Sequence, residues 1–330
     1  MDPIYFLETI VKILVVLLVF SALAGFTTYF ERKVLAYMQR RLGPVHVGPV
    51  GLLQVLCDGI KLFTKEDFVP QNANKPIFMI APVITAATAF IAMSAIPFLP
   101  EFTIGNHTVT PIISDINVGL LFVLGVMATG LYGPLLAGMA SGNKWALLGG
   151  ARTAIQLLSY EIVTGLSILA PLMLIGSLSL IDINNYQTGG LTDWLIWTQP
   201  VAFILFLIAG FAETNRTPFD LLEHEAEIIA GYATEYSGMR WGMFFIGEYA
   251  NLFTISFLAA IIFLGGFNDL WFIPGGIAII LKVMLLIFFF LWTRASWPHV
   301  RPDQLMWLCW KVLMPIAVIN IIVTGVVIML

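Results

Sequence analysis

A run of acidic residues is the part of this sequence best suited to proton chemistry. Seven of the twenty Asp and Glu residues fall between positions 213 and 248, where only Arg216 and Arg240 oppose them. The seven are Glu213, Asp220, Glu223, Glu225, Glu227, Glu235 and Glu248. Carboxyl groups that crowd together in a partly apolar setting raise one another's pKa, so some hold a proton near neutral pH. The run therefore predicts a proton path or a cation site.

Further charges fall inside or at the ends of apolar segments, where they are costly and are by default a functional hypothesis. Glu161 follows Tyr160 within one such segment, Glu248 begins another, and Glu31 and Arg32 end the first. A purely structural interpretation also exists for each of them. Glu161 and Glu248 could make interhelical hydrogen bonds, and Glu31 with Arg32 could form an interfacial ion pair. Lys282, within a third segment, could snorkel or neutralise one of these glutamates.

Other kinds of chemistry have little support in the sequence. The two cysteines, Cys57 and Cys309, are far apart, and the four histidines lack the spacing of metal ligands. A divalent cation at the acidic run is disfavoured because Glu225 points away from the helix face that Glu223 and Glu227 share. We see no nucleophile–base pair and no phosphate-binding loop. We therefore expect no metal and no cofactor bound by this chain, and a role in binding or conducting rather than in bond chemistry.

The composition indicates the elements that must position these residues. Of 330 residues, 59% are hydrophobic and only 11% are charged, whereas soluble domains carry about a quarter charged residues. This excludes a soluble enzyme, a nucleic-acid binder and a disordered chain. The apolar runs are continuous rather than alternating, which disfavours a β-barrel. We predict an all-α polytopic membrane protein that forms one integral membrane domain over residues 1–330.

Eight apolar segments approach the roughly 20 residues that a membrane crossing needs. They are 8–30, 77–99, 117–140, 153–175, 200–214 (short), 243–264, 275–293 and 309–329. All but two of the sixteen Lys and Arg residues lie in or beside alternate loops, and loops 100–116, 176–199 and 265–274 have none. The positive-inside rule makes the basic loops cytoplasmic. Both termini are then on the outer, periplasmic side, as an even number of crossings requires.

The two long inner loops, 31–76 and 213–242, carry most of the non-spanning sequence. Within the first, Gly51 to Phe63 places Leu52, Val55, Leu56, Ile60 and Phe63 on one helical stripe. This pattern predicts an amphipathic helix on the inner membrane surface. A simple packing helix at the surface is the alternative interpretation.

Five inner-side segments together resemble one family. They read ERKVLAYMQRRLGPVHVGPVGLLQVLCDGIKLFTKED (31–67), ARTAIQLLSYE (151–161), AETNRTPFDLLEHEAEIIAGYATEYSG (212–238), GEYAN (247–251) and LWTRASWPHVRPDQLMWLCWK (291–311). This resembles the quinone-site membrane subunit of complex I, the proton-pumping NADH:quinone oxidoreductase. The resemblance covers almost the whole chain. One departure is FDLLEHE, where the family usually has FDLPEGE or FDLTEGE; Leu222 and His224 differ, but the acidic positions remain.

The resemblance implies an eight-helix core whose inner loops join a peripheral arm and form part of a quinone chamber. It implies chamber roles for Glu31, Arg32, Arg41, Asp58, Arg216, Phe219, Asp220, Glu223, Glu225, Glu227 and Arg294. It implies a proton relay through Tyr160, Glu161, Glu213 and Glu248. Quinone would be the substrate, and iron–sulfur clusters and FMN would belong to partner subunits.

The expected partners are the iron–sulfur subunits of the peripheral arm, small membrane subunits, antiporter-like subunits, quinone and membrane lipid, with no nucleic acid. The expected location is the bacterial inner membrane, because no targeting segment is evident. Two alternatives remain open at this point. One is a homologous subunit of a membrane-bound hydrogenase. The other is a stand-alone cation transporter, which predicts broken helices at the midplane and an internal repeat.

Overall fold

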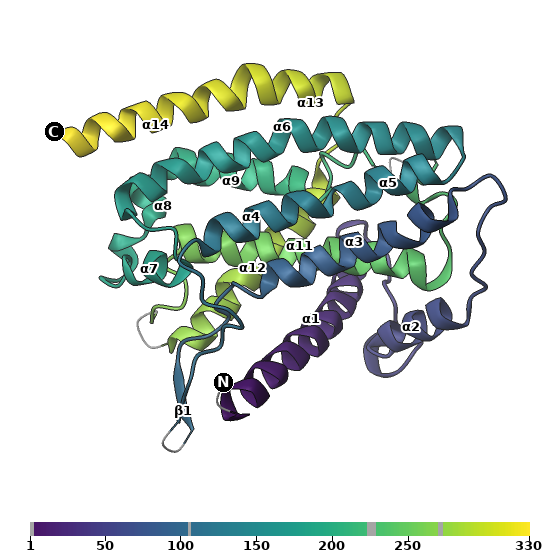
Figure 1. Cartoon of the computed structure of the whole chain (residues 1–330), viewed down its shortest axis with the longest axis horizontal. Helices are drawn as coiled ribbons and strands as arrows, with labels where there is room; N and C mark the ends of the chain where they lie inside the picture. The colour runs from purple at the N-terminus through teal and green to yellow at the C-terminus, as the bar shows by residue number, and fades with distance from the viewer. Residues whose placement is uncertain (1–2, 105–106, 223–228, 270–272) are drawn as a thin grey trace.

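The computed structural model describes residues 3–104, 107–222, 229–269 and 273–330, and it is an elongated bundle of helices (Figure 1). The long helices run roughly side by side. They are α1 (Pro3–Met38), α3 (Lys75–Met93), α4 (Gly119–Gly130), α5 (Tyr132–Ala140), α6 (Lys144–Ile175), α9 (Pro200–Glu213), α11 (Gly238–Phe263), α12 (Gly275–Ser296) and α14 (Met314–Met329). The all-α membrane architecture expected from the sequence is therefore confirmed.

Shorter elements connect these helices. On one side of the bundle they are α2 (Gln54–Thr64), preceded by a 3-10 turn at Pro49–Gly51, and a second 3-10 turn at Gly231–Ala233. Elsewhere they are α7 (Leu180–Asn185), a 3-10 turn at Leu191–Asp193, α8 (Leu195–Thr198), and α13 (Pro302–Leu308), which continues through a π-helical turn (Cys309–Leu313) into α14. A small antiparallel hairpin pairs β1 (Phe102–Ile104) with β2 (His107–Val109), with Phe102 opposite Val109.

Among the described residues, seven helical stretches are long and apolar enough to cross a membrane. They include Gly119–Ala140, which joins α4 and α5, and Pro302–Met329, which joins α13 and α14. The fifth predicted crossing is the shorter α9, of 14 residues. At 1.5 Å per residue it spans only about 21 Å, less than the roughly 30 Å of hydrocarbon. For α9 to cross the bilayer, the adjoining α8 must extend it. A total of eight crossings therefore stays a prediction.

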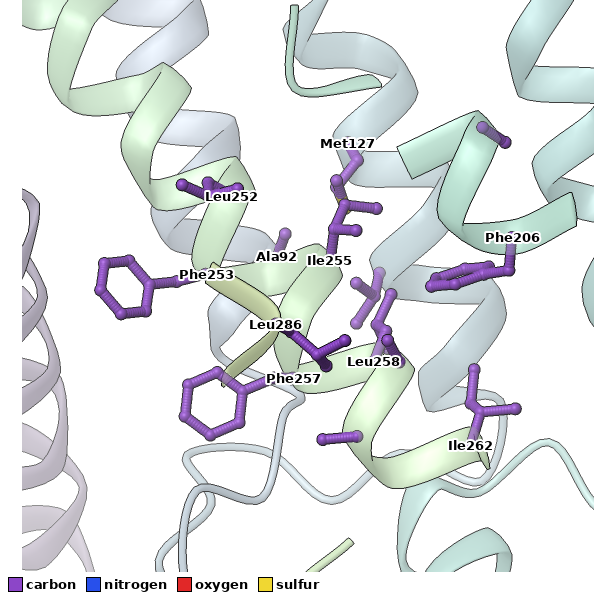
Figure 2. Close-up of a cluster of buried hydrophobic side chains, with 14 of the residues drawn as sticks. Ala92, Met127, Phe206, Leu252, Phe253, Ile255, Phe257, Leu258, Ile262 and Leu286 are labelled. Carbon is purple, nitrogen blue, oxygen red and sulfur yellow. The ribbon is translucent and has the colours of Figure 1, made fainter. Parts of the chain in front are cut away.

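Helix α11 is the centre of the bundle. In its most apolar window 83% of the residues are buried, against 17% for α1 and for the α13–α14 stretch. Figure 2 shows Leu252, Phe253, Ile255, Leu258 and Ile262 of α11 reaching outward in different directions. They meet side chains of α3, α4, α9 and α12, labelled there as Ala92, Met127, Phe206 and Leu286. A helix that is apolar on every face is stable only when other helices surround it.

Small residues let the neighbouring backbones approach α11 and α6 closely. A Cβ added at Gly247 of α11 would lie 3.0 Å from the Thr85 carbonyl oxygen of α3. A Cβ at Gly138 of α5 would lie 2.5 Å from the Ala146 carbonyl oxygen of α6. Close approach of this kind is the usual source of helix association within a membrane, because lipid offers no hydrophobic drive.

The predicted surface helix of the first inner loop is present as α2, which packs against α1 and α11. Three residues of its apolar stripe point away from the bundle: Leu56, Ile60 and Phe63 are all more than 60% exposed. The prediction was wrong for Val55, which was expected on the same stripe but instead faces α1 and, with Gly59, lines a cavity described below. The amphipathic pattern therefore marks the side of α2 that is free to meet lipid, as expected for a helix lying along a membrane surface.

Both termini lie at the end of the bundle that also holds α7, α8 and the hairpin (Figure 1). We predict that this end faces the periplasm. Alkaline phosphatase fused after Leu330 should be active, and a green fluorescent protein fused there should be dark. A fusion within loop 65–74 should give the reverse pattern. A fluorescent C-terminal fusion would mean that α8 and α9 do not cross the membrane and that the number of crossings is odd.

Candidate functional site

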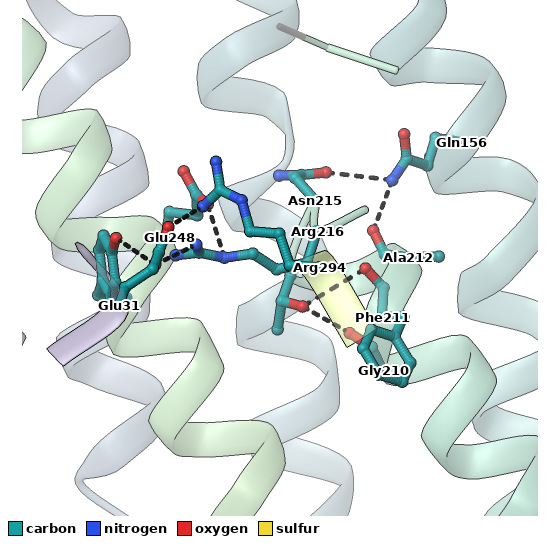
Figure 3. A network of polar contacts seen from close by, with 11 residues as sticks. Glu31, Gln156, Gly210, Phe211, Ala212, Asn215, Arg216, Glu248 and Arg294 are labelled. Atoms are coloured by element: carbon teal, nitrogen blue, oxygen red, sulfur yellow. Dashed lines mark hydrogen bonds and ion pairs between the residues drawn. The ribbon is translucent and has the colours of Figure 1, made fainter. Parts of the chain in front are cut away.

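The site is built around the sharp turn that follows α9. The helix ends at Glu213, and Asn215 adopts a left-handed conformation with φ of 51°, which asparagine tolerates better than most residues. The Arg216 backbone N–H donates to the Phe211 carbonyl at 3.1 Å, which turns the chain back on itself. The Gln156 amide of α6 donates to the Ala212 carbonyl at 2.5 Å and to Asn215 Oδ1 at 3.2 Å (Figure 3). Helix α6 thus fixes the turn that directs Arg216 into the bundle.

Arg216 is the most buried charge of the site, with only 1% of its side chain exposed. Its Nη1 lies 2.6 Å from Glu31 Oε2 of α1, and its Nε lies 3.1 Å from Glu248 Oε1 of α11. Its guanidinium also stacks over the Tyr249 ring, 4.4 Å from the ring centroid. One cation therefore joins two helices that are more than 200 positions apart in the sequence, as Figure 3 shows for Glu31 and Glu248.

Glu31 receives three donors. Besides Arg216, the Tyr249 hydroxyl donates to Glu31 Oε2 at 2.7 Å, and Arg294 Nη1 of α12 bonds its other oxygen, Oε1. A carboxylate that accepts several charge-assisted hydrogen bonds is held in its ionised form. Arg294 is the less buried arginine, with a third of its side chain exposed. We define the buried ion cluster as Glu31, Arg216, Glu248, Tyr249 and Arg294.

The charges of the buried ion cluster balance, with two carboxylates against two guanidinium groups. Burial by itself lowers the pKa of Arg216, but Glu31, Tyr249 and Glu248 raise it more, so its pKa lies well above the ordinary value. Arg216 is therefore a permanent cation. Any change of charge in the cluster must come from a carboxyl group or from movement of a side chain.

A cavity of about 470 Å³ opens beside the cluster between α1, α2 and α11. Its walls are mostly apolar, with Ala24, Val55, Leu62, Trp241 and Phe245 among the lining side chains. Its polar lining includes Thr28, Arg32, Asp58 and Lys61, and it also reaches Tyr249. Because Tyr249 donates to Glu31, the apolar cavity and the buried ion cluster share one side chain.

A second cavity lies on the other side of Phe245 and is small and polar. Its volume of about 30 Å³ suits about one water molecule. Its lining includes Asp220, Glu248 and Arg294 together with Asn215 and Tyr232. The predicted chamber residue Asp220 therefore lies beside the buried ion cluster, because it lines the same polar cavity as Glu248 and Arg294.

The predicted relay residues lie along α6 and α9. Glu213 is 7% exposed at the last residue of α9, and Glu161 of α6 lies within electrostatic range of it. Tyr160 is buried and packs its ring against Phe219, with centroids 5.3 Å apart. Glu161 itself is exposed on the surface of the chain, although it lies near the middle of the spanning helix α6. A carboxylate at that depth needs a protein neighbour, because lipid is a poor solvent for charge.

Three predicted chamber residues lie apart from the cluster. Arg32 and Asp58 pair with each other at 2.6 Å beside the large cavity, and both are partly exposed. Arg41 is exposed and donates from Nε to Gln39 Oε1 at 2.6 Å. Glu223, Glu225 and Glu227 lie outside the described residues, so the structure gives no position for them.

Among the described residues, Lys282 forms no ion pair with a glutamate and its amine does not reach the surface, so neither role considered from the sequence, counter-ion or snorkel, is seen there. It is 8% exposed, its Nζ donates to the Gly266 carbonyl at 2.8 Å, and it stacks over the Trp194 ring. Among the described residues, no group of three or more His, Cys, Asp or Glu side chains has the arrangement of a metal site.

Sequence reasoning missed two residues that hold the site together. Tyr249 follows Glu248 in the sequence, and nothing in that position indicates that its hydroxyl reaches Glu31. Gln156 lies four residues before Tyr160 on α6, and a glutamine in an apolar stretch is the signal that could have indicated it. Its partner is a backbone carbonyl 56 residues away, which no local pattern reveals.

Comparison with known proteins adds an independent observation. The family model of NADH dehydrogenase matches residues 11–325. The chain belongs to this family, among the H subunits of NADH-quinone oxidoreductase. Similar proteins of that name come from a Nitratiruptor species, 79% identical, and Wolinella succinogenes, 74% identical. In both, the match covers 99% of this chain and 99% of the relative. A Helicobacter pylori protein of the same name is 62% identical over 99% of each chain.

Membership in this family confirms the resemblance seen in the five inner-side segments. It makes the chain a membrane subunit of an enzyme complex rather than an enzyme complete in itself. The hydrogenase and stand-alone transporter alternatives receive no support from these relatives, whose names all refer to a quinone oxidoreductase.

We predict that Arg216→Met destabilises the protein far more than Arg32→Met. Removing Arg216 leaves two buried carboxylates without their shared cation, a loss of about 3–5 kcal/mol. Removing the partly exposed Arg32 costs about 1 kcal/mol or less. Thermal unfolding of the purified complex, followed by the loss of intact assembly, measures both. Equal melting temperatures for the two variants would contradict the central role given to Arg216.

Proposed function

We propose that this chain forms the membrane part of the quinone site in a proton-translocating NADH:quinone oxidoreductase. In this proposal, its buried carboxyl groups pass the effect of quinone reduction toward proton-moving subunits. The observation that carries the proposal is the apolar cavity between α1, α2 and α11, which reaches Tyr249 of the buried ion cluster. Family membership and the names of the relatives support it.

The cavity has the character that a quinone requires. A quinone carries a long apolar tail and a polar ring, and ligand sites of this kind combine apolar walls with a few polar groups. In the proposal, the tail lies against Ala24, Val55, Leu62 and Phe245. The exposed apolar stripe of α2 keeps the mouth of the cavity at the membrane surface, where a quinone diffuses.

The buried ion cluster is where the chemistry of the quinone would act on this chain. Reduction of a quinone adds electrons and takes up protons, so the charge beside the cavity changes. Arg216 stays charged, whereas Glu31 and Glu248 compete for it at 2.6 and 3.1 Å. A shift of Arg294 from Glu31 toward Asp220 or Glu248, its neighbours around the small polar cavity, would carry that change inward.

From the cluster, the proposed relay continues through Glu213 and Tyr160 to Glu161. Several buried polar atoms along this route have no hydrogen-bond partner among the described residues, namely Gln156 Oε1, Tyr160 Oη, Arg216 Nη2 and Asn251 Oδ1. Buried polar groups of this kind are usually satisfied by ordered water, and water is what a proton relay needs between carboxyl groups. Glu161, exposed on the surface, would hand over to a neighbouring subunit.

The proposed partners supply the electron transfer and the proton movement that this chain does not perform in the proposal. Both cysteines are free, and they lie on α2 and in the π-helical turn before α14, so this chain has no cysteine set for an iron–sulfur cluster. Electrons would come from the iron–sulfur clusters and FMN of peripheral-arm subunits docked on the long inner loops. Small membrane subunits and antiporter-like subunits would receive the relay. The proposed location is the bacterial inner membrane, with the long loops cytoplasmic.

We predict that Gly59→Trp impairs quinone reduction while Ile60→Trp does not. Gly59 lines the cavity and has open space around the position of a Cβ, so an indole there fills the cavity without displacing backbone. The KM for a long-tailed quinone should rise by about tenfold, equivalent to about 1.4 kcal/mol of binding. Ile60 is 62% exposed, does not line the cavity, and is the matched control. Equal KM values for the two variants would contradict the proposal that the quinone binds in this cavity.

We predict that Glu213→Gln and Glu161→Gln uncouple the assembled complex. Loss of a proton-transferring group typically slows its step by about 10²-fold or more, so proton pumping should fall much more than the amount of assembled complex. The measurement is proton pumping and quinone reduction by the complex in proteoliposomes.

Glu101→Gln is the control for these two variants, since Glu101 is an exposed carboxylate outside the relay. It should leave pumping and quinone reduction unchanged. If both relay variants pump protons as the wild type does, the proposed relay through α6 and α9 is wrong, while the cavity assignment still stands on its own test.

A further inference from the structure

A third cavity lies at the end of the bundle away from α2 and the buried ion cluster. Its volume is about 510 Å³, and it is enclosed by the ends of α6 and α14 and by the segment from α7 to the start of α9. These elements all meet at the end of the bundle that holds the C-terminus (Figure 1). No part of the quinone or relay proposal uses this cavity.

The cavity combines two kinds of wall. Leu174 of α6 and Val323 and Val327 of α14 give it an apolar side. Its polar lining residues include Asp193 and Gln199 from the segment between α7 and α9, and Asn320, which lies one turn before Val323 on α14. An apolar wall beside a group of polar side chains suits an amphipathic ligand better than either a free ion or a pure hydrocarbon chain.

The polar side has a fixed floor made by side chains of two helices. Asn320 Nδ2 donates to Gln199 Oε1 at 3.1 Å, and Gln199 Nε2 donates to Thr324 Oγ1 at 2.9 Å. The Thr324 hydroxyl in turn donates to the Asn320 carbonyl at 2.8 Å. Gln199 is 7% exposed and Thr324 is 3% exposed. Each amide NH₂ group has a second N–H, so Gln199 and Asn320 can each donate to one more acceptor, such as a phosphate oxygen.

The charge of this site is a single carboxylate. Asp193 is exposed in the lining, and among the described residues the side-chain bond it receives is from the Thr192 hydroxyl at 3.3 Å. No Lys, Arg or His belongs to the described lining of the cavity. Asp193 also makes no ion pair with another described residue. The site therefore offers a carboxylate for a cationic group, next to neutral N–H donors for an anionic one.

The cavity lies at the level expected for lipid headgroups, where an amphipathic ligand with a charged head would bind. Helix α6 ends at Ile175, and α14 ends at Met329, so the cavity lies where two spanning helices leave the bilayer. The neighbouring Trp197 is 69% exposed and donates from its indole to the Leu191 carbonyl at 2.9 Å. Exposed tryptophans with one bonded N–H are typical of the lipid headgroup level.

We propose that this cavity is a binding site for a phospholipid with a primary amine in its headgroup, phosphatidylethanolamine. Its ammonium group pairs with Asp193, and its phosphate accepts hydrogen bonds from the Gln199 and Asn320 amides. One acyl chain lies along Val323, Val327 and Leu174. The amine is what selects this lipid, because the quaternary ammonium of phosphatidylcholine has no N–H to donate to a carboxylate.

The test uses the purified complex in nanodiscs and a phosphatidylethanolamine probe with a photoreactive group on its acyl chain. After illumination, mass spectrometry identifies the labelled peptides. We expect labelling of the α14 segment 320–327 that excess unlabelled phosphatidylethanolamine suppresses and phosphatidylcholine does not. In Asp193→Asn, this suppressible labelling should fall by about tenfold, as expected for the loss of a charge-assisted hydrogen bond.

Two further variants make the result specific. Glu101→Gln removes a carboxylate from another connecting segment at the same end of the bundle and should leave the labelling unchanged. Thr324→Val keeps the shape of the floor but removes the acceptor for Gln199, and it should weaken the labelling without abolishing it. Equal labelling in Asp193→Asn and wild type would overturn the proposal. So would equal suppression by phosphatidylcholine, or labelling of another subunit instead of segment 320–327.

Discussion

The shared cation Arg216 is the interaction on which the half of the bundle near α2 depends. It brings the C-terminal part of α1, the N-terminal half of α11 and the turn after α9 to one point, and Arg294 adds α12 through Glu31. Two carboxylates buried at that point repel each other, and without Arg216 only Arg294, which is paired with Glu31, would remain to balance them. The arrangement gains little stability over an apolar one, since desolvation of the ions offsets most of their attraction.

Helix α11 connects this charged point to the rest of the fold. Its apolar half is surrounded by helices on every side (Figure 2), which leaves it little freedom to move. In its N-terminal half, Phe245 and Tyr249 pack at a tilted angle with centroids 4.9 Å apart, and Phe245 lines both the apolar cavity and the small polar one. A ligand in the apolar cavity and a proton in the polar one would therefore act on the same rigid element.

The two ends of the bundle differ in kind. The end near α2 holds the ion cluster, whereas the end with α7 and α8 is closed mainly by neutral amides. Gln187 donates to the Ile261 carbonyl at 2.9 Å and accepts from the Gly265 N–H, so it closes the end of α11. Lys282 adds a bond to the Gly266 carbonyl and stacks on Trp194. Neutral hydrogen bonds of this type hold a helix end in place without offering a carboxyl group to a proton.

The sequence by itself determined the class of fold, the approximate position of seven apolar helical stretches, and the amphipathic helix α2. It could do so because apolar length, hydrophobic period and the position of Lys and Arg are local properties that the membrane constrains strongly. It also determined the family, through five segments of inner-loop sequence. Only the tertiary structure decided which charges meet. The pairing of Glu31 with Arg216, 185 positions away, and the separation of Arg41 from the cluster depend on helix packing. Packing is set by side chains distant in the chain, and no local pattern encodes it.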